Sequence, residues 1–143
     1  MTVEFKRILV GVDESKDALL ALNTAIQLAK RDAAELVIVS VLENEQLSIY
    51  QTLDSDYLHG EHAELEQRLR QYRHQAQEAG VKDVRMMVTT GEPGESIVKD
   101  VIPDVKPDLL VIGSLAKHGI SRYFGSQAAY MAKYAPITVL VVR

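Results

Sequence analysis

The sequence predicts an α/β domain built on a single doubly wound five-stranded parallel sheet with helices on both faces. Apolar runs rich in β-branched residues, such as Leu36–Val39 and Leu109–Ile112, are typical of parallel strands that are buried on both faces. Segments with the apolar spacing of amphipathic helices alternate with these runs along the chain. A length of 143 residues with 47% hydrophobic residues suits one domain, which we expect to span residues 1–143.

The first half of the chain is expected to supply two strands and two helices. The segment Arg7–Val12 predicts the first strand, and Ser15 is the expected N-cap of the following helix. The segment Glu35–Leu42, continuously apolar through Leu36–Val39, predicts the second strand. The polar stretch Glu43–Asp56 lacks a clear period and predicts a surface loop, and Tyr57–Ala79 has the spacing of a long amphipathic helix.

The third strand and the helix after it come next. The segment Lys82–Thr89 is less apolar than the first two strands, so we expect it nearer an edge of the sheet. The motif Gly91-Glu92-Pro93 indicates a helix start, because proline in the first turn of a helix sacrifices no hydrogen bond. Pro103 and Pro107 are expected to end this helix.

The last part of the chain predicts a strand, loop, helix and strand in succession. The strands are Leu109–Ile112 and Ile137–Val142, and the helix is expected from Ser126 to about Tyr134. Gly113-Ser114 ends the first of these strands, and Gly125-Ser126 is expected at the helix start. The polar segment between them contains Lys117, His118, Gly119, Ser121 and Arg122. Glycines beside a helix N-terminus favour the close approach of an anion, so a phosphate group is the expected ligand.

Composition excludes several classes of function. The formal net charge of −4 argues against broad attraction to nucleic acid or to an anionic membrane. No cysteine is present, which excludes disulfides and thiolate chemistry. The amino-terminal segment lacks a signal-peptide pattern, and no apolar run approaches the roughly 20 residues that cross a bilayer. We therefore expect a cytoplasmic protein.

Four motifs, in this order along the chain, resemble the universal stress protein family. The resemblance covers the whole chain. The motifs are Ile8-Leu9-Val10-Gly11-Val12-Asp13-Glu14-Ser15, the strand Leu36 to Val41 with Leu42-Glu43, Gly91-Glu92-Pro93, and Gly113-x-x-Ala116 with Gly125-Ser126, Ala135-Pro136 and Val139-Leu140-Val141-Val142.

The resemblance implies a fold and a ligand. The implied fold is adenine nucleotide alpha hydrolase-like, with strand order 3-2-1-4-5, so that Asp13 and Gly113 end adjacent strands at the switch point where ligands bind. The implied function is a stress-response protein that binds ATP, with or without Mg²⁺, or a related adenine nucleotide, and that signals as a homodimer formed through the C-terminal strand. The implied nucleotide-binding residues are Val12, Asp13, Val41, Gly113, Leu115, Ala116, Gly125, Ser126, Gln127 and Ala128.

The glycine loop departs from the family's nucleotide-binding pattern. That pattern has a glycine, two residues, a second glycine, nine residues, and then glycine with Ser or Thr. Here Ala116 replaces the second glycine, and only eight residues, Lys117 to Phe124, precede Gly125. The departure predicts weaker nucleotide binding, because an added Cβ and a shifted helix start can both misplace the amide donors. The alternative function is therefore a dimeric interaction module that has lost its nucleotide.

Other chemical readings have less support in the sequence. Asp13 could bind a ribose hydroxyl or simply cap the next helix. The sequence His59-Gly60-Glu61-His62 offers two imidazoles but no evident third ligand, so we expect no metal site. The chain has no nucleophile elbow and no Walker A lysine, so we expect binding without catalytic residues, and at most slow ATP hydrolysis.

Overall fold

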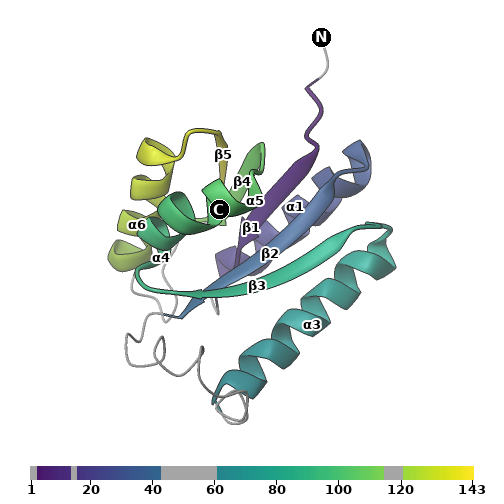
Figure 1. Cartoon of the computed structure of the whole chain (residues 1–143), viewed down its shortest axis with the longest axis horizontal. Coiled ribbons are helices and arrows are strands. Elements are labelled where there is room, and N and C mark those ends of the chain that lie inside the picture. The colour runs from purple at the N-terminus through teal and green to yellow at the C-terminus, as the bar shows by residue number, and fades with distance from the viewer. Residues whose placement is uncertain (1–2, 14–15, 43–60, 115–120) are drawn as a thin grey trace.

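The computed structural model describes residues 3–13, 16–42, 61–114 and 121–143, and its centre is a five-stranded parallel sheet. The strand order is β3-β2-β1-β4-β5, which confirms the predicted fold class (Figure 1). The third strand lies at one edge of the sheet, as its lower apolar content predicted. The strands are β1 (Arg7–Gly11), β2 (Glu35–Leu42), β3 (Val84–Thr90), β4 (Leu109–Gly113) and β5 (Thr138–Val142).

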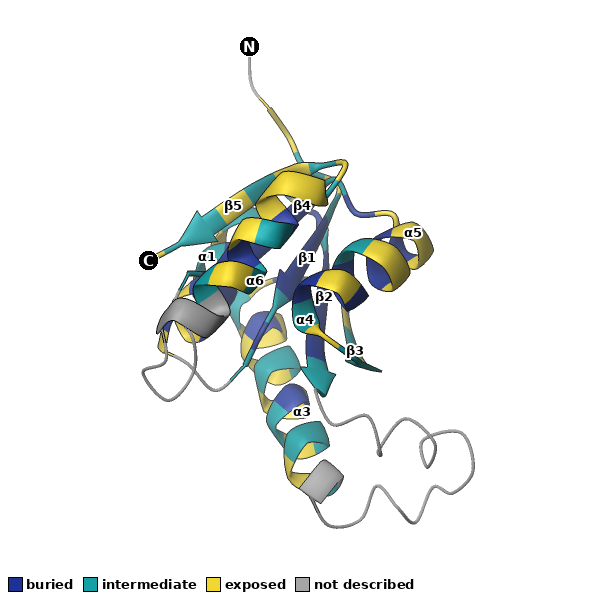
Figure 2. Ribbon diagram, turned by 90° about the vertical axis from the view of Figure 1, so that its left-hand side faces the viewer, coloured by how far each residue is buried: buried dark blue, intermediate teal, exposed yellow. Residues whose placement is uncertain are grey.

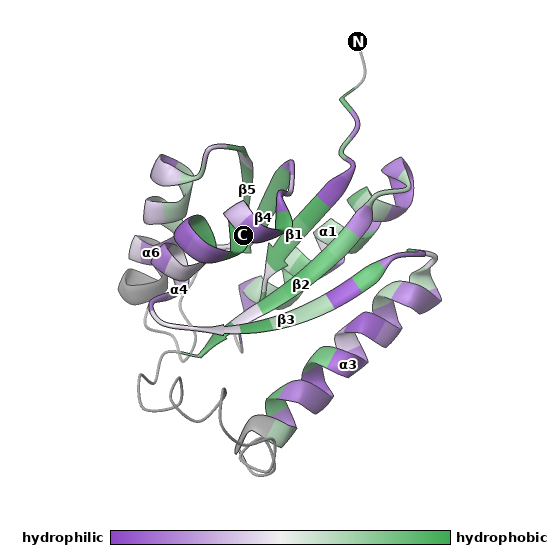
Figure 3. Cartoon of the chain, viewed as in Figure 1, coloured by the Kyte–Doolittle hydropathy of each residue, from purple (hydrophilic) through white to green (hydrophobic). Residues whose placement is uncertain are grey.

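Side-chain alternation divides the apolar residues of the central strands between two cores. Ile8 and Val10 of β1 pack on one face of the sheet, and Leu9 between them packs on the other. All three residues are fully buried. Figure 3 shows the hydrophobic residues concentrated along the strands, while the outer side of the long helix below β3 is hydrophilic. Burial on both faces is the reason that these strands have unbroken apolar sequences.

Helices cover both faces of the sheet. The helices α1 (Lys16–Asp32) and α3 (Glu61–Ala79) supply the first core, and α6 (Ser121–Tyr134) supplies part of the second. The rest of the second core comes from a continuous helical segment made of α4 (Pro93–Ser96), the π-helical turn η2 (Ile97–Val101) and α5 (Ile102–Val105). Figures 1 and 2 show the two groups on opposite sides of the sheet. The predicted loop Glu43–Asp56 and the N-cap Ser15 lie outside the described residues.

The expectation that Pro103 ends its helix is wrong. Pro103 lies within α5, and the helix continues to Val105. The N–H of Ile102 donates to the carbonyl of Ile97, five residues back, which is the spacing of a π-helix. This wider turn precedes the proline, whose ring would otherwise crowd the carbonyl four residues before it. The helix ends where Lys106 adopts a left-handed conformation, with φ of 57°.

The expectation that Ser126 begins the last helix is also wrong. The helix α6 begins at Ser121, so Gly125 and Ser126 lie in its second turn. Only the first four N–H groups of an α-helix lack a partner within the helix. The amides available to an anion at this end of α6 therefore belong to the turn before Gly125.

Carboxylates fix the amino ends of the strands. Asp108 accepts hydrogen bonds from the backbone N–H groups of Lys6 and Arg7, at 2.8 and 3.0 Å. Glu35 of β2 forms ion pairs with Arg7 of β1, at 2.8 Å, and with Arg85 of β3, at 2.6 Å. Burial opposes ionisation of Glu35, but the two guanidinium groups lower the pKa of this carboxyl overall. The Glu35 ion pairs join the amino ends of β1, β2 and β3, and the Asp108 hydrogen bonds join β1 to the residue before β4. This end of the sheet is opposite the carboxyl ends of the strands.

Candidate nucleotide-binding site

The candidate site begins where β1 and β4 end side by side. The two strands pair in parallel, with Val10 opposite Val111. Asp13 follows β1 and is half-buried, while Gly113 is the buried last residue of β4. The N–H of Val12 donates to the carbonyl of Val39 at 2.9 Å, which extends the pairing beyond the end of β1. The strand order reverses direction at this point, so Asp13 and Gly113 lie at the carboxyl ends of neighbouring strands at the switch point.

Gly113 lies directly against the first turn of α1. A Cβ atom at Gly113 would lie 2.7 Å from the carbonyl carbon of Asp17 and 2.9 Å from the nitrogen of Ala18. Both atoms belong to the backbone, so they cannot move aside as a flexible side chain could. This glycine therefore allows α1 to pack closely on the end of β4.

The next residue, Ser114, is held by two hydrogen bonds. Its hydroxyl donates to Oδ2 of Asp17 at 2.9 Å, and its N–H donates to the carbonyl of Val142 at 3.1 Å. The carboxylate of Asp17 is one of the few buried charged groups among the described residues, with the whole residue 7% exposed. Ser114 is the last described residue before the segment that the sequence associates with phosphate.

Val41 lies near the carboxyl end of β2, two strands away from Gly113. It pairs with Thr89 of β3, is half-buried, and packs against the second core. It therefore lies at the carboxyl end of the sheet, on the same side as Asp13 and Gly113. Its side chain, however, contributes to the core as any strand valine would.

The residues predicted on α6 have different surroundings. A Cβ at Gly125 would meet no atom within 4 Å, and Ser126 is exposed. Oε1 of Gln127 accepts a hydrogen bond from the N–H of Gly94 at 2.7 Å, so this side chain caps α4. Ala128 is buried in the second core.

Sequence reasoning missed Asp17 and the contact between Gln127 and Gly94. A signal for Asp17 exists, because it lies four and eight residues before Ala21 and Ala25 and so falls on the buried stripe of α1. No comparable signal marks the Gln127 contact, which joins helices 33 residues apart.

Part of the predicted site lies outside the described residues. Leu115, Ala116 and the metal motif residue His59 belong to that part of the chain. Within the described ranges, no group of three or more acidic, histidine or cysteine residues is arranged to hold a metal ion. The same ranges contain no helix with the length and apolar character needed to cross a bilayer.

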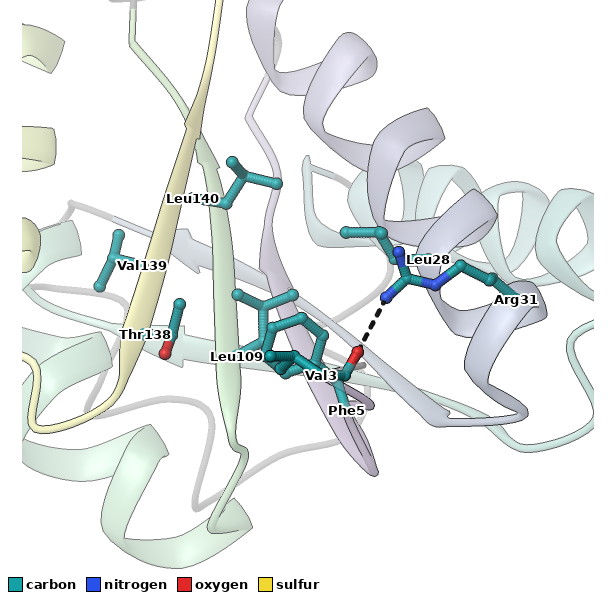
Figure 4. Close-up of a pocket in the computed structure, with 8 residues that line it drawn as sticks. All are labelled: Val3, Phe5, Leu28, Arg31, Leu109, Thr138, Val139 and Leu140. Carbon is teal, nitrogen blue, oxygen red and sulfur yellow. Dashed lines mark hydrogen bonds between the residues drawn. The ribbon is translucent and has the colours of Figure 1, made fainter. Parts of the chain in front are cut away.

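A surface pocket lies near the amino ends of β4 and β5, away from Asp13 and Gly113. This surface pocket of about 490 Å³ is lined by apolar residues near the first residues of β4 and β5 and by the end of α1 (Figure 4). The guanidinium of Arg31, one of its polar groups, donates hydrogen bonds to the carboxylate of Asp32 and to the carbonyl of Val3. The lining residues are Val3, Phe5, Leu28, Arg31, Leu109, Thr138, Val139 and Leu140. The pocket is separate from the crevice at Asp13 and Gly113.

The fold and the position of the crevice define a doubly wound α/β protein with a potential ligand site at its switch point. The sequence profile of the Universal stress protein family matches residues 4–143. A relative from Staphylococcus aureus (strain USA300), described as a "Putative universal stress protein", is 34% identical over 142 residues, covering 99% of this chain and 86% of that protein. This chain therefore belongs to the universal stress protein family.

Solved structures agree with this assignment. The universal stress protein UspA from Lactobacillus plantarum superposes with a TM-score of 0.81 at 24% identity, covering 99% of this chain and 100% of that one. A universal stress protein solved in complex with cAMP gives a TM-score of 0.69 at 27% identity, covering 99% of this chain and 98% of that one. The first likeness supports the fold, and the second also shows that a relative of this fold binds an adenine nucleotide.

Proposed function

We propose that this chain is a stress-response protein that binds ATP or a related adenine nucleotide in the crevice between the ends of β1 and β4. The observation that supports the proposal is the position of Asp13 and Gly113 at the carboxyl ends of the adjacent parallel strands β1 and β4, at the switch point. Ligands of doubly wound folds bind outside the carboxyl ends of the strands at this point. The relative solved with cAMP supports the adenine nucleotide as the ligand class.

Each part of the proposed site has a chemical role. The carboxylate of Asp13 accepts hydrogen bonds from ribose hydroxyl groups. The N–H groups in the first turn of α6 face the phosphate, because helix N-termini favour anions. The open surface at Gly125 leaves space beside that turn. The described residues offer no cluster of metal ligands, so any Mg²⁺ would be held mainly by the phosphates and water.

The proposed mechanism is ligand-dependent signalling by a cytoplasmic homodimer. Nucleotide binding favours one state of the protein and so changes the surface that a partner protein meets. The edge strand β5 is the proposed dimer contact, because its outer side has no neighbouring strand among the described residues. The proposal includes no catalytic residue.

Asp13→Ala tests the site directly. Removing the carboxylate should weaken ATP and AMP binding about tenfold or more in calorimetric titration, since a hydrogen bond to a charged group contributes roughly 1.5–3 kcal/mol. Asp104→Ala is a matched control, because Asp104 is an exposed carboxylate on α5. This helix leads into the amino end of β4, whereas the proposed site is at the carboxyl end. Equal affinities in wild type and Asp13→Ala would contradict the proposed site.

The alternative is a dimeric interaction module without nucleotide, and the observation that favours it is the altered glycine loop, with Ala116 and the shorter spacing. Mass spectrometry of freshly purified, denatured protein distinguishes the possibilities. Bound ATP or AMP supports nucleotide-dependent signalling, and bound ADP indicates slow hydrolysis. An empty site together with no calorimetric binding of ATP or AMP supports the alternative.

A further inference from the structure

The buried carboxylate of Asp17 needs a physical explanation. Burial of a charged group is costly unless hydrogen bonds compensate for the lost water. Oδ2 of Asp17 has such a bond, from the hydroxyl of Ser114 at 2.9 Å. These two residues are 97 positions apart and come from the first turn of α1 and the end of β4. We call this contact the Asp17–Ser114 pair.

The pair lies at a junction of three elements. Ser114 continues directly from β4, its hydroxyl is bound to α1, and its N–H is bound to the carbonyl of Val142 at the end of β5. The missing Cβ of Gly113 allows α1 to approach the end of β4 this closely. The position and orientation of Ser114 are therefore fixed from three directions.

We propose that Asp17 is a positioning residue of the nucleotide site, acting through Ser114. This inference rests on the proposed function, because it concerns the same crevice. Ser114 is the first residue after β4, at the carboxyl end of the strand where the proposed site lies, so its fixed position also fixes the β4 side of that site. Asp17 also lies four residues after Asp13 in the sequence, so the pair joins the chain that follows β1 to the chain that follows β4.

The negative charge of the Asp17 carboxylate distinguishes a positioning role from a role in packing alone. A carboxylate in the crevice repels the phosphate groups of a nucleotide, so its charge opposes binding while its hydrogen bond supports binding. Asn at position 17 keeps an oxygen that accepts from Ser114 and removes the charge. Ala removes both. The two substitutions should therefore have different effects on affinity, and the effect of Asn should depend on the number of phosphates.

Calorimetric titration with ATP and with AMP, without divalent metal, tests the proposal. Asp17→Ala and Ser114→Ala should each weaken binding about tenfold, and the double variant should be no weaker than either single one, because both remove the same hydrogen bond. Asp17→Asn should bind AMP at least as tightly as wild type does, and it should strengthen ATP binding by a larger factor, because ATP carries more negative charge. Asp108→Ala is the control. It removes a carboxylate that accepts backbone hydrogen bonds at the amino ends of β1 and β4, so both affinities should stay unchanged.

Amide hydrogen exchange in the free protein gives a second readout. Loss of the pair in Asp17→Ala should accelerate exchange of the Ser114 N–H about tenfold, while the amides of Leu109–Ile112 keep their protection. Asp17→Asn should restore the wild-type exchange rate.

The outcomes separate this inference from the proposed function. A wild-type protein that binds neither ATP nor AMP overturns the proposed function and the positioning role with it. A wild-type protein that binds nucleotide, with Asp17→Ala and Ser114→Ala binding equally well, overturns the positioning role alone. Failure of Asp17→Asn to restore affinity also overturns it, because the role requires only the hydrogen-bond acceptor.

Discussion

Gly113 and Gly125 belong to the same sequence motif but have opposite surroundings. A Cβ at Gly113 would lie 2.7 Å from backbone atoms of α1, whereas a Cβ at Gly125 would meet nothing within 4 Å. Gly113 is thus required for packing in the free protein. No packing contact with the described residues requires a glycine at position 125, which agrees with the proposal that a ligand approaches the backbone at this position.

Alanine substitutions at the two glycines should therefore have opposite effects on stability. Gly113→Ala should lower the free energy of unfolding by about 1–3 kcal/mol, because α1 must move away from β4. Gly125→Ala should raise it by roughly 0.5–1 kcal/mol, since alanine favours a helix interior. Urea denaturation measures both values. A destabilised Gly125→Ala would mean that this glycine has a structural role after all.

Asp32 predicts an acid-dependent loss of stability. The hydrogen bond from Arg31, together with the bond from the N–H of Phe5, lowers the pKa of the Asp32 carboxyl to about 2. An unfolded aspartate has a pKa near 3.9, so the unfolded chain takes up this proton first as pH falls. The contribution of Asp32 to stability is therefore fully present above about pH 4 and decreases between about pH 4 and pH 2.

Comparison with Asp32→Asn measures this contribution. Urea denaturation between pH 5 and pH 2.5 should show a less steep pH dependence in Asp32→Asn than in wild type, because the variant lacks the titrating group. The difference in stability between the two proteins should shrink as pH falls. Parallel curves over this range would show that Asp32 titrates alike in the folded and unfolded chain.

At the scale of elements, the start of α6 determines where a residue should be inserted to restore the glycine spacing of the family. The helix begins at Ser121, so a residue added after Phe124 would rotate the first turn of α6 by about 100° relative to Gly125. An insertion after Ile120 restores the family's spacing and leaves the helix intact. Ala116→Gly restores the second glycine.

The combined variant should bind ATP more tightly than wild type. One recovered hydrogen bond to phosphate contributes roughly 1.5–3 kcal/mol, which corresponds to about tenfold to a hundredfold in affinity. Calorimetric titration of wild type, each single change and the combination gives the comparison. Unchanged or weaker binding in the combined variant would show that the native loop already places its donors correctly.

At the scale of the whole molecule, the edge strand β5 carries apolar side chains at the border of the sheet. Leu140 on β5 is 37% exposed and borders the apolar pocket beside α1 (Figure 4). Val139 and Val141 on the same strand are half-buried and pack toward the second core. An exposed edge strand with an apolar side chain favours association with a second copy, which pairs the same strand across a two-fold axis.

Leu140→Lys should therefore convert a dimer into a monomer. A charged side chain at the contact remains solvated only when the two copies separate. Val88→Lys on β3 is the matched control, because Val88 is 40% exposed on the opposite edge strand. Sedimentation at micromolar concentration should show a monomer for Leu140→Lys and a dimer for wild type and Val88→Lys. A monomeric wild-type protein at this concentration would contradict the proposed dimer.

The sequence by itself determined which segments form the strands of the sheet. Apolar runs such as Leu36–Val39 are long enough to identify buried parallel strands. Such a run is a local feature, so the sequence shows it without knowledge of distant contacts. Combined with the resemblance, they correctly predicted the order of the five strands and the meeting of β1 with β4. The edge position of β3 was also correct, because a strand with one bare side needs fewer apolar residues.

Only the tertiary structure decided the contacts that shape the site. The bond between Asp17 and Ser114 spans 97 residues, and the bond between Gln127 and Gly94 spans 33. No local period records such pairs, because each depends on how two elements pack after both have formed. The same reason explains the two wrong helix boundaries: packing on the second core extends the helix past Pro103, and the start of α6 at Ser121 is not marked by the apolar pattern.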